Sequence, residues 1–183
     1  TDPAACIIKH TNPCGAATAA TLHDAYVNAY EADSVSSFGA IVALNREVDA
    51  ATAEEMSKIF LEVIMAPAFT KEALHILEGK KNIRLIELSK PESGQVTVKK
   101  VSGGLLVQTE DDIQEDRANY KVVTKVQPTE EQWKALEFAW KLVKHVKSNA
   151  ILISNEKRTL GVGAGQMNRV GSAKIALEQA GEA

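Results

Sequence analysis

The chain has 183 residues, of which 45% are hydrophobic and 25% are charged, and its formal net charge is -3. This composition is typical of a globular protein, and the lack of a long basic run or of an apolar run of roughly 20 residues argues against a nucleic-acid-binding or membrane protein. Cys6 and Cys14 are the only cysteines, and no secretory leader precedes them, so we expect a cytoplasmic protein.

The first half of the chain alternates between strand and helix patterns. Residues 5–8 predict a buried strand, and residues 13–32 predict a helix with Asn12 as its cap and a proline in its first turn. Residues 39–45 predict a second strand, after which Thr52 and Glu55 form the capping-box pattern of a helix over 53–63. The next predicted elements are a strand at 63–67, a helix at 71–79 between Thr70 and Gly79, and a strand at 83–88.

The pattern is looser between residues 90 and 120. Residues 96–101 and 104–109 predict two paired strands, and the acidic run 110–116 predicts a solvated loop. The apolar residues of 130–146 mix two faces, so we expect this longest helix to be buried on most sides. Strands at 149–154 and 159–165 and a helix from about residue 167 complete an expected α/β class with mixed strands.

Two segments of the chain resemble each other. "AACIIKHTNPCGAATAATLHDA" and "KRTLGVGAGQMNRVGSAKIALEQA" each run from a strand through a glycine-bearing turn into a helix of small residues. The similarity suggests two related halves, although any strand, turn and helix in succession has the same outline. We expect a first subdomain at residues 1–126 and the start of a second, incomplete one at residues 127–183.

The Pro13-Cys14-Gly15 turn is similar to that of the zinc deaminases, in which H-x-E and P-C-x-x-C motifs supply the metal ligands and the general acid and base. Here the residue three after Cys14 is Ala17, and no H-x-E occurs. A catalytic zinc ion needs three protein ligands at defined spacing, which this pattern does not provide. We therefore expect a three-layer, cytidine-deaminase-like fold, a mixed sheet with flanking helices, without a catalytic metal.

Longer stretches carry a closer resemblance. The chain contains "IIKHTNPCGAA", "DSVSSFGAIVALNREVD", "LEVIMAP", "GGLLVQ", "VVTKVQPTEEQ" and "VKSNAILIS" followed by "TLGVGAGQMNRVGSAKIA". In this order they resemble the bifunctional purine-biosynthesis enzymes called AICAR transformylase/IMP cyclohydrolase, over essentially the whole chain. The resemblance covers the middle of the transformylase part. The family's cyclohydrolase domain, its Arg-Tyr-Gly phosphate segment and its carboxy-terminal folate segment are missing, so we expect a fragment that is inactive or incomplete alone.

The family transfers a formyl group from 10-formyltetrahydrofolate to the 5-amino group of AICAR, an aminoimidazole carboxamide ribonucleotide. An aromatic amine is a weak nucleophile, so a base must remove its proton while a donor stabilises the developing oxyanion. The resemblance implies that His10 is the proton acceptor and that Lys9 keeps His10 neutral and stabilises negative charge. It also implies that Asn149 binds substrate close to the transferring formyl group.

The resemblance assigns three further residues to ligands. Asp33 and Arg169 match substrate-binding residues, and Val170 matches a folate-contacting apolar residue. The family also implies a homodimer whose active sites combine residues of both subunits. Neither a catalytic metal, nor nucleic acid, nor a membrane is an expected partner.

The residues alone leave other interpretations open. His10 and Lys9 could be the polar end of a strand, and Asp33 and Asn149 could be turn or cap residues. The G-x-G-x-G run at 161–165 lacks the dinucleotide-binding spacing and more simply lets the backbone pass close to a ligand or the sheet. Two other classes therefore compete with the transformylase: a metal-dependent nucleoside deaminase, and a fragment that acts only as a nucleotide-binding or dimerisation module.

Overall fold

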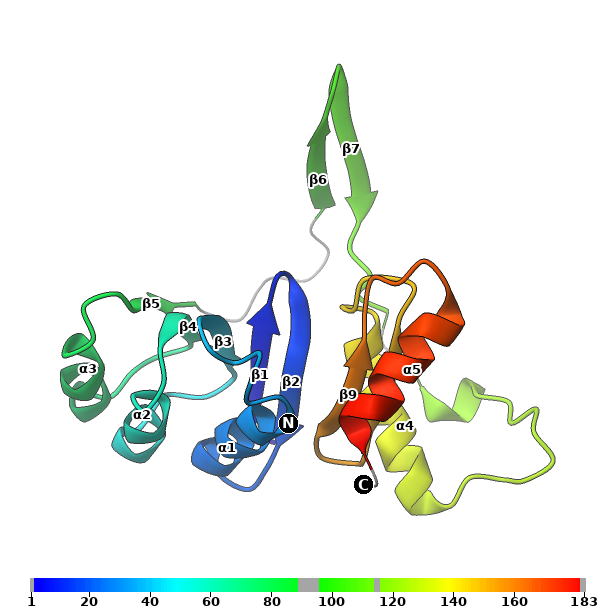
Figure 1. Ribbon diagram of the computed structural model, residues 1–183, viewed down its shortest axis with the longest axis horizontal. Helices are drawn as coiled ribbons and strands as arrows, with labels where there is room; N and C mark the ends of the chain where they lie inside the picture. Colours follow the sequence, from blue (N-terminus) through cyan, green and yellow to red (C-terminus); the bar gives the residue numbers. More distant parts are fainter. Residues whose placement is uncertain (1, 89–95, 114–115, 182–183) are drawn as a thin grey trace. The chain divides into compact units, whose positions relative to one another are not determined.

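The computed structural model describes residues 2–88, 96–113 and 116–181 (Figure 1). The chain forms two compact units, one made of Thr1–Ser89 together with Pro128–Ala183 and the other of Lys90–Gln127. All six predicted site residues belong to the larger unit.

The larger unit is built on a five-stranded mixed sheet. Its strands are β1 (Ala4–Lys9), β2 (Asn12–Thr18), β3 (Ala40–Leu44), β4 (Leu61–Ala66) and β5 (Arg84–Glu87), in the order β2-β1-β3-β4-β5. β1 is antiparallel to both of its neighbours, whereas β3, β4 and β5 are parallel. A two-residue turn joins β1 to β2, while helices connect the parallel strands.

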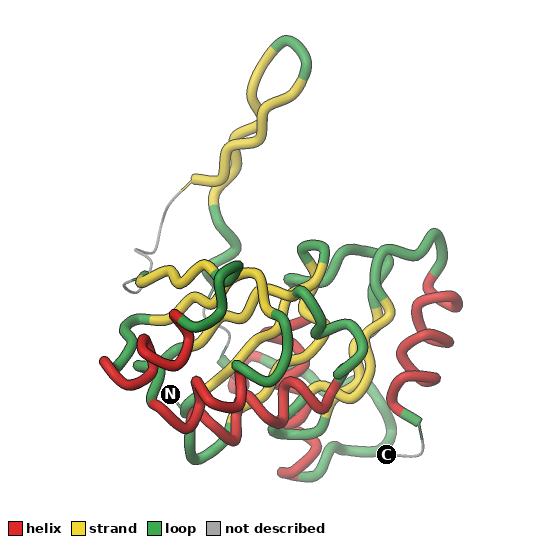
Figure 2. The backbone as a smooth tube through the Cα atoms, turned by 60° about the vertical axis from the view of Figure 1, so that its left-hand side comes forward, coloured by secondary structure: helices red, strands yellow, loops and turns green. Residues whose placement is uncertain are grey.

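Three helices lie along one face of this sheet: α1 (Leu22–Ala32), α2 (Ala50–Met56) and α3 (Lys71–Glu78) (Figures 1 and 2). Each begins at a side chain that accepts a backbone N–H, namely Thr21, Asp49 and Thr70. Alternate strand residues point toward these helices and are fully buried, among them Ile7, Val42 and Ile64. The hydrophobic core therefore lies between the sheet and the three helices.

The carboxy-terminal part of the larger unit contains α4 (Glu130–Val143), β8 (Ile151–Ser154), β9 (Thr159–Gly163) and α5 (Arg169–Ala180). A capping box between Thr129 and Gln132 begins α4. β8 and β9 form an antiparallel pair, and α5 packs on both strands. This part therefore contains a second β-hairpin followed by a helix.

β9 lies beside β2, although the two strands are far apart in the sequence. The Thr18 N–H donates to the Lys157 carbonyl at 2.8 Å. The buried Thr159 hydroxyl accepts the Ala16 N–H at 3.0 Å and donates to the Ala16 carbonyl at 3.4 Å. These bonds join the second hairpin to the edge of the five-stranded sheet.

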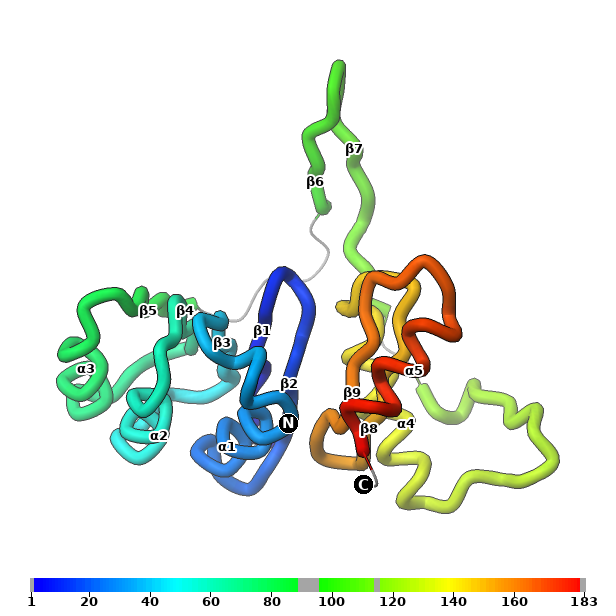
Figure 3. The backbone as a smooth tube through the Cα atoms, in the orientation of Figure 1, coloured from blue at the N-terminus to red at the C-terminus, as the bar shows by residue number. Residues whose placement is uncertain are grey.

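The smaller unit contains an antiparallel hairpin of β6 (Val96–Val101) and β7 (Gly104–Thr109), followed by a short 3-10 helix (Arg117–Asn119) (Figure 3). Every residue of the two strands is exposed. The two paired strands predicted here are confirmed.

The helix predicted over residues 13–32 is wrong in its first part. Asn12–Thr18 form β2, and the helix begins at Leu22 with Thr21 as its cap. The backbone of β2 pairs with β1 from Asn12 to Thr18, with one irregularity at Cys14, and this tertiary pairing outweighs the helix preference of the alanines. Asn12 is not a helix cap, because its side-chain oxygen accepts the Lys147 N–H.

The capping box predicted at Thr52 and Glu55 is also wrong. Asp49 caps α2 and accepts the Thr52 N–H at 2.8 Å, so Thr52 lies inside the helix and is fully buried. The helix ends at Met56 because Leu61–Ala66 pair with β3 as a strand.

The burial predicted for the longest helix is wrong as well. α4 has no buried residue, and Leu136 and Trp140 are 50% and 56% exposed. The reason is that α4 packs mainly on the short strand β8. The strands and helices predicted elsewhere are confirmed to within a few residues. Of the acidic run 110–116, residues 114 and 115 lie outside the described residues.

The mixed α/β class is confirmed by the sheet and its helices. The three-layer arrangement, the cytidine-deaminase-like assignment and the division at residue 126 stay predictions. Over the described part of the chain, no helix combines the length and apolar character needed to cross a bilayer.

Candidate functional site

The predicted base and its neighbouring cation lie at the end of the β1–β2 hairpin. His10 and Thr11 form the two-residue turn, and both have a left-handed backbone, with φ of 49° and 65°. Asn and Gly are the usual residues in such a turn, and a β-branched residue rarely adopts it. His10 is exposed, whereas Lys9 at the end of β1 is partly buried. The turn therefore holds His10 at the surface in a constrained backbone conformation.

Lys9 is anchored to the segment that precedes β3. Its Nζ donates to the Phe38 carbonyl at 2.5 Å. Asp33, at the end of α1, begins the same segment: its carboxylate accepts the Ser36 N–H at 2.9 Å, and its carbonyl accepts the Ser37 hydroxyl at 2.7 Å. One ordered turn therefore holds Asp33 and the anchor of Lys9.

Cys14 is influenced electrostatically by both of these residues. Burial, and to a smaller extent the Asp33 carboxylate, raise the pKa of the Cys14 thiol to about 11, against an opposing effect of the Lys9 cation. The thiol donates to the Ile7 carbonyl at 3.4 Å. A thiol with this pKa stays protonated near neutral pH, which agrees with a packing role rather than a nucleophilic one.

Asn149 is held between the second hairpin and α5. Its backbone N–H and its Nδ2 both donate to the Gln166 carbonyl, at 3.1 and 3.0 Å. Its own carbonyl accepts the hydroxyl of Ser172, a buried residue of α5, at 2.7 Å, and the Ser148–Asn149 peptide bond is cis. Because an amide nitrogen carries two hydrogens, the bond to Gln166 leaves a second N–H on Asn149 for a ligand.

Arg169 and Val170 are the first two residues of α5, and both are exposed. Asn168 caps this helix by accepting the Gly171 N–H at 2.7 Å. Because the Ser172 hydroxyl donates to the Asn149 carbonyl, the first turn of α5 lies close to Asn149.

The Asn12 side chain links the two groups of predicted residues. The Asn12 Oδ1 accepts the Lys147 N–H at 2.9 Å across 135 positions of sequence. The Lys147 carbonyl in turn accepts the Gly165 N–H at 2.7 Å. The turn that carries Lys9 and His10 thus lies against the segment that leads to Asn149.

Sequence reasoning missed Asn12, Gln166 and Ser172 as parts of this site. Asn12 carried a helix-cap signal, and the other two have no local pattern that marks a role. Their role is set by contacts between segments far apart in the sequence, to which a local pattern gives no access.

The glycines at 161–165 have a structural role. A Cβ on Gly161 would lie 2.0 Å from the Ala176 carbonyl oxygen, and one on Gly163 would lie 2.0 Å from that of Ser172. These two glycines therefore let α5 lie directly on β9. The backbone does approach another segment closely here, but the neighbour is the helix α5 rather than a ligand or the sheet.

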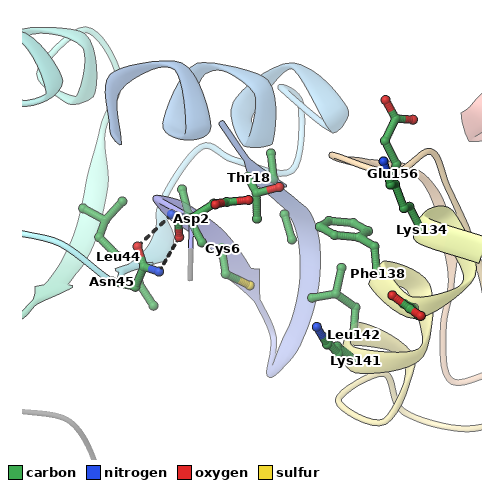
Figure 4. A pocket seen from close by; sticks show the side chains of 16 residues that line it. Asp2, Cys6, Thr18, Leu44, Asn45, Lys134, Phe138, Lys141, Leu142 and Glu156 are labelled. Carbon is green, nitrogen blue, oxygen red and sulfur yellow. Dashed lines mark hydrogen bonds between the residues drawn. The ribbon is translucent and has the colours of Figure 1, made fainter. Parts of the chain in front are cut away.

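A separate pocket of about 590 Å³ lies between the sheet and α4 (Figure 4). Cys6, Thr18 and Leu44 line it from the sheet, and Phe138 and Leu142 line it from the helix. None of the six predicted site residues lines this pocket. The predicted site and the pocket are therefore different places on the larger unit.

The fold and the site define an α/β protein that brings a lysine and histidine from one hairpin toward an asparagine beside a second hairpin. Within the described ranges, no three His, Cys, Asp or Glu side chains are grouped as metal ligands.

The family model described as AICARFT/IMPCHase bienzyme matches residues 1–179, and the chain belongs to this family. The chain is 60% identical over 185 aligned residues to the bifunctional purine biosynthesis protein PurH of Listeria monocytogenes, and 55% identical over 184 to that of Bacillus thuringiensis. Each alignment covers 100% of this chain and 36% of the relative, so the chain spans about a third of the length of these relatives. The family resemblance seen in the sequence is confirmed.

Proposed function

We propose that the chain is the central part of an AICAR transformylase, which transfers a formyl group from 10-formyltetrahydrofolate to the 5-amino group of AICAR. The observation that supports this most is the link between the Lys9–His10 turn and the segment leading to Asn149, through the Asn12–Lys147 hydrogen bond. The two halves of the expected site are thereby joined within one unit.

His10 accepts the proton of the 5-amino group as the new C–N bond forms, and returns it to the folate nitrogen that leaves. A neutral imidazole nitrogen can accept a proton and the resulting imidazolium can donate it, so one side chain can perform both steps. The Lys9 cation stabilises the oxyanion of the tetrahedral intermediate, an effect of about 3 kcal/mol for one well-placed donor. The Phe38 carbonyl uses one of the three Lys9 N–H donors and holds the ammonium group in place.

The other residues bind the two substrates. Asn149 donates its second amide N–H to an oxygen close to the formyl group. Asp33 and Arg169 bind AICAR, and Val170, 65% exposed, offers an apolar contact to the folate. The exposure of Arg169 and Val170 agrees with a site that ligands and a second subunit complete.

The active protein is a cytoplasmic homodimer that shares active-site residues between subunits. Because the relatives are much longer than this chain, the isolated chain supplies one part of the site and has little or no turnover alone. Binding of AICAR is therefore a better first test than catalysis.

Calorimetric titration of the full chain with AICAR tests the proposal. We expect saturable binding that weakens about tenfold in His10→Ala and in Asn149→Ala, as for the loss of one hydrogen bond of about 1.4 kcal/mol. His75→Ala and Asn82→Ala are matched controls, because both residues are exposed and lie in other parts of the unit. Unchanged affinity in both site variants would contradict the proposed roles. Heat of dilution alone from a folded chain would show that further segments or a partner subunit build the site.

A further inference from the structure

We propose that Asn12 is a positioning residue, which sets the backbone of His10 relative to Asn149. This inference rests on the proposed function, because it concerns the placement of the proposed base. It starts from the observation that Asn12 uses both polar atoms of its side chain on the two sides of the site.

On the hairpin side, Asn12 holds a strained turn. His10 and Thr11 have positive φ, a conformation that costs non-glycine residues about 1–2 kcal/mol each. The Asn12 Nδ2 donates to the His10 carbonyl at 3.2 Å, and the Thr11 hydroxyl donates to the same carbonyl at 2.6 Å. Two side chains that follow His10 therefore fix the peptide that carries the proposed base.

On the other side, Asn12 fixes the segment that leads to Asn149. Its Oδ1 accepts the Lys147 N–H, and the Lys147 carbonyl accepts the Gly165 N–H. The carbonyl of the next residue, Gln166, accepts the backbone N–H and one Nδ2–H of Asn149. Hydrogen bonds, together with the Gly165–Gln166 peptide bond, therefore connect the His10 carbonyl to the Asn149 side chain. Asn12 is the member of this series that joins the first hairpin to the segment preceding β8.

Asn12 does not hold the two hairpins together by itself. At the other end of β2, the Ala16 and Thr18 backbones bond to Thr159 and Lys157. Variants of Asn12 should therefore fold with the hairpins paired, while the turn and residue 147 lose their fixed spacing.

Amide hydrogen exchange in the full chain tests the bond itself. We expect Lys147 to exchange about tenfold faster in Asn12→Ala than in the unaltered chain. Asn12→Asp keeps an acceptor for Lys147 but loses the donor to His10, so it should retain the slow exchange. Asn82→Ala, which alters an exposed asparagine elsewhere, is the control. Unchanged exchange of Lys147 in Asn12→Ala would overturn the proposal.

A double-mutant cycle separates positioning from a merely structural effect. AICAR titration should show about tenfold weaker binding for Asn12→Ala, and the double variant with His10→Ala should bind within about twofold of the His10→Ala single variant. Losses that multiply would mean that Asn12 acts independently of His10, and would overturn the inference while leaving the proposed function intact. If the unaltered chain and His10→Ala bind AICAR equally well, the proposed function fails first, and the role assigned to Asn12 fails with it.

Discussion

Two segments of the larger unit have the same order of elements, a hairpin followed by a helix (Figure 3). They differ in the size of their sheet and in how many helix residues are buried. The first hairpin, β1–β2, belongs to a five-stranded sheet, and its helix α1 buries Leu22, Ala25, Tyr26 and Ala29. The second hairpin, β8–β9, is a two-stranded sheet, and its helix α5 buries only Ser172 and Ala176. The shared order therefore does not imply equal stability.

The close contact between helix and strand is nevertheless the same in both segments. A Cβ on Gly15 of β2 would lie 2.0 Å from the Ala29 carbonyl oxygen, as one on Gly161 would from that of Ala176. Both segments have this tight helix–strand contact, but only the first is part of the large core. The two properties are therefore independent. The predicted site residues lie near the ends of strands and helices in both segments, and hydrogen bonds hold Lys9, Asp33 and Asn149 in place.

We expect the largest effect from a substitution that disrupts this helix–strand contact in the first segment. Gly15→Ala places a methyl group against the backbone of α1 and should cost about 3 kcal/mol or more, because α1 carries the main core. Gly161→Ala makes the same clash in α5 and should cost less, with faster amide exchange confined to β8, β9 and α5. Gly104→Ala, which meets open space, is the control. Urea unfolding measures the free energy of unfolding of all three variants. Equal losses of stability in Gly15→Ala and Gly161→Ala would show that the two helices contribute equally to stability.

Matched leucines sharpen the comparison. Leu22 of α1 is 7% exposed and Leu177 of α5 is 61% exposed. Leu22→Ala should lower the free energy of unfolding by about 3 kcal/mol, since it leaves a cavity, whereas Leu177→Ala should change it by less than about 0.5 kcal/mol. Chemical denaturation followed by circular dichroism gives both values. A large loss of stability in Leu177→Ala would mean that another surface covers this side of α5 in solution.

The junction between the segments depends on one buried hydroxyl. Thr159→Val keeps the side-chain shape but leaves the buried Ala16 N–H without its acceptor, which should cost about 2 kcal/mol. Thr97→Val, at an exposed position of β6, is the control and should be nearly neutral. If thermal unfolding shows the two variants to be equal, the junction does not rely on this bond.

The smallest expected effect concerns pH and the first segment alone. Burial, with a smaller contribution from Cys14, raises the pKa of Cys6 from 9.0 to about 11. The unfolded chain therefore loses this proton first, so stability is unaffected below about pH 9 and falls as the pH rises toward 11, by about 1 kcal/mol at pH 10. Urea unfolding at pH 7 and pH 10 should show a smaller decline in Cys6→Ala. An equal decline in both chains would exclude a contribution from this thiol.

Local patterns predicted most of the elements, because apolar runs of four to six residues and clear caps mark them. Thr70 and Gly79 bound α3 as expected, and the paired strands β6 and β7 were found in place. The error at residues 13–18 has a physical cause. Pro13 and the following alanines favour a helix locally, but the neighbouring β1 pairs with all of these residues except Cys14. No local pattern contains that information.

The site was assigned by resemblance rather than by pattern. Lys9 and His10 are adjacent in the sequence, but their link to the segment before Asn149 includes the side chain of Asn12, whose local signal indicated a helix cap. The roles of all six site residues stay predictions, whereas the contacts around them are now defined.

The contact between β2 and β9 has a consequence for how the chain folds during synthesis. Residues 4–87 contain every strand of the five-stranded sheet and all three helices that cover it, so this part can fold while the rest is being synthesised. The Ala16–Thr159 contact spans 143 positions and can form only after β9 has been synthesised. Until then β2 presents an open edge of backbone N–H and C=O groups, to which another nascent chain could add a strand. The contacts with β9 and the residues just before it cover part of this edge, at Ala16 and Thr18.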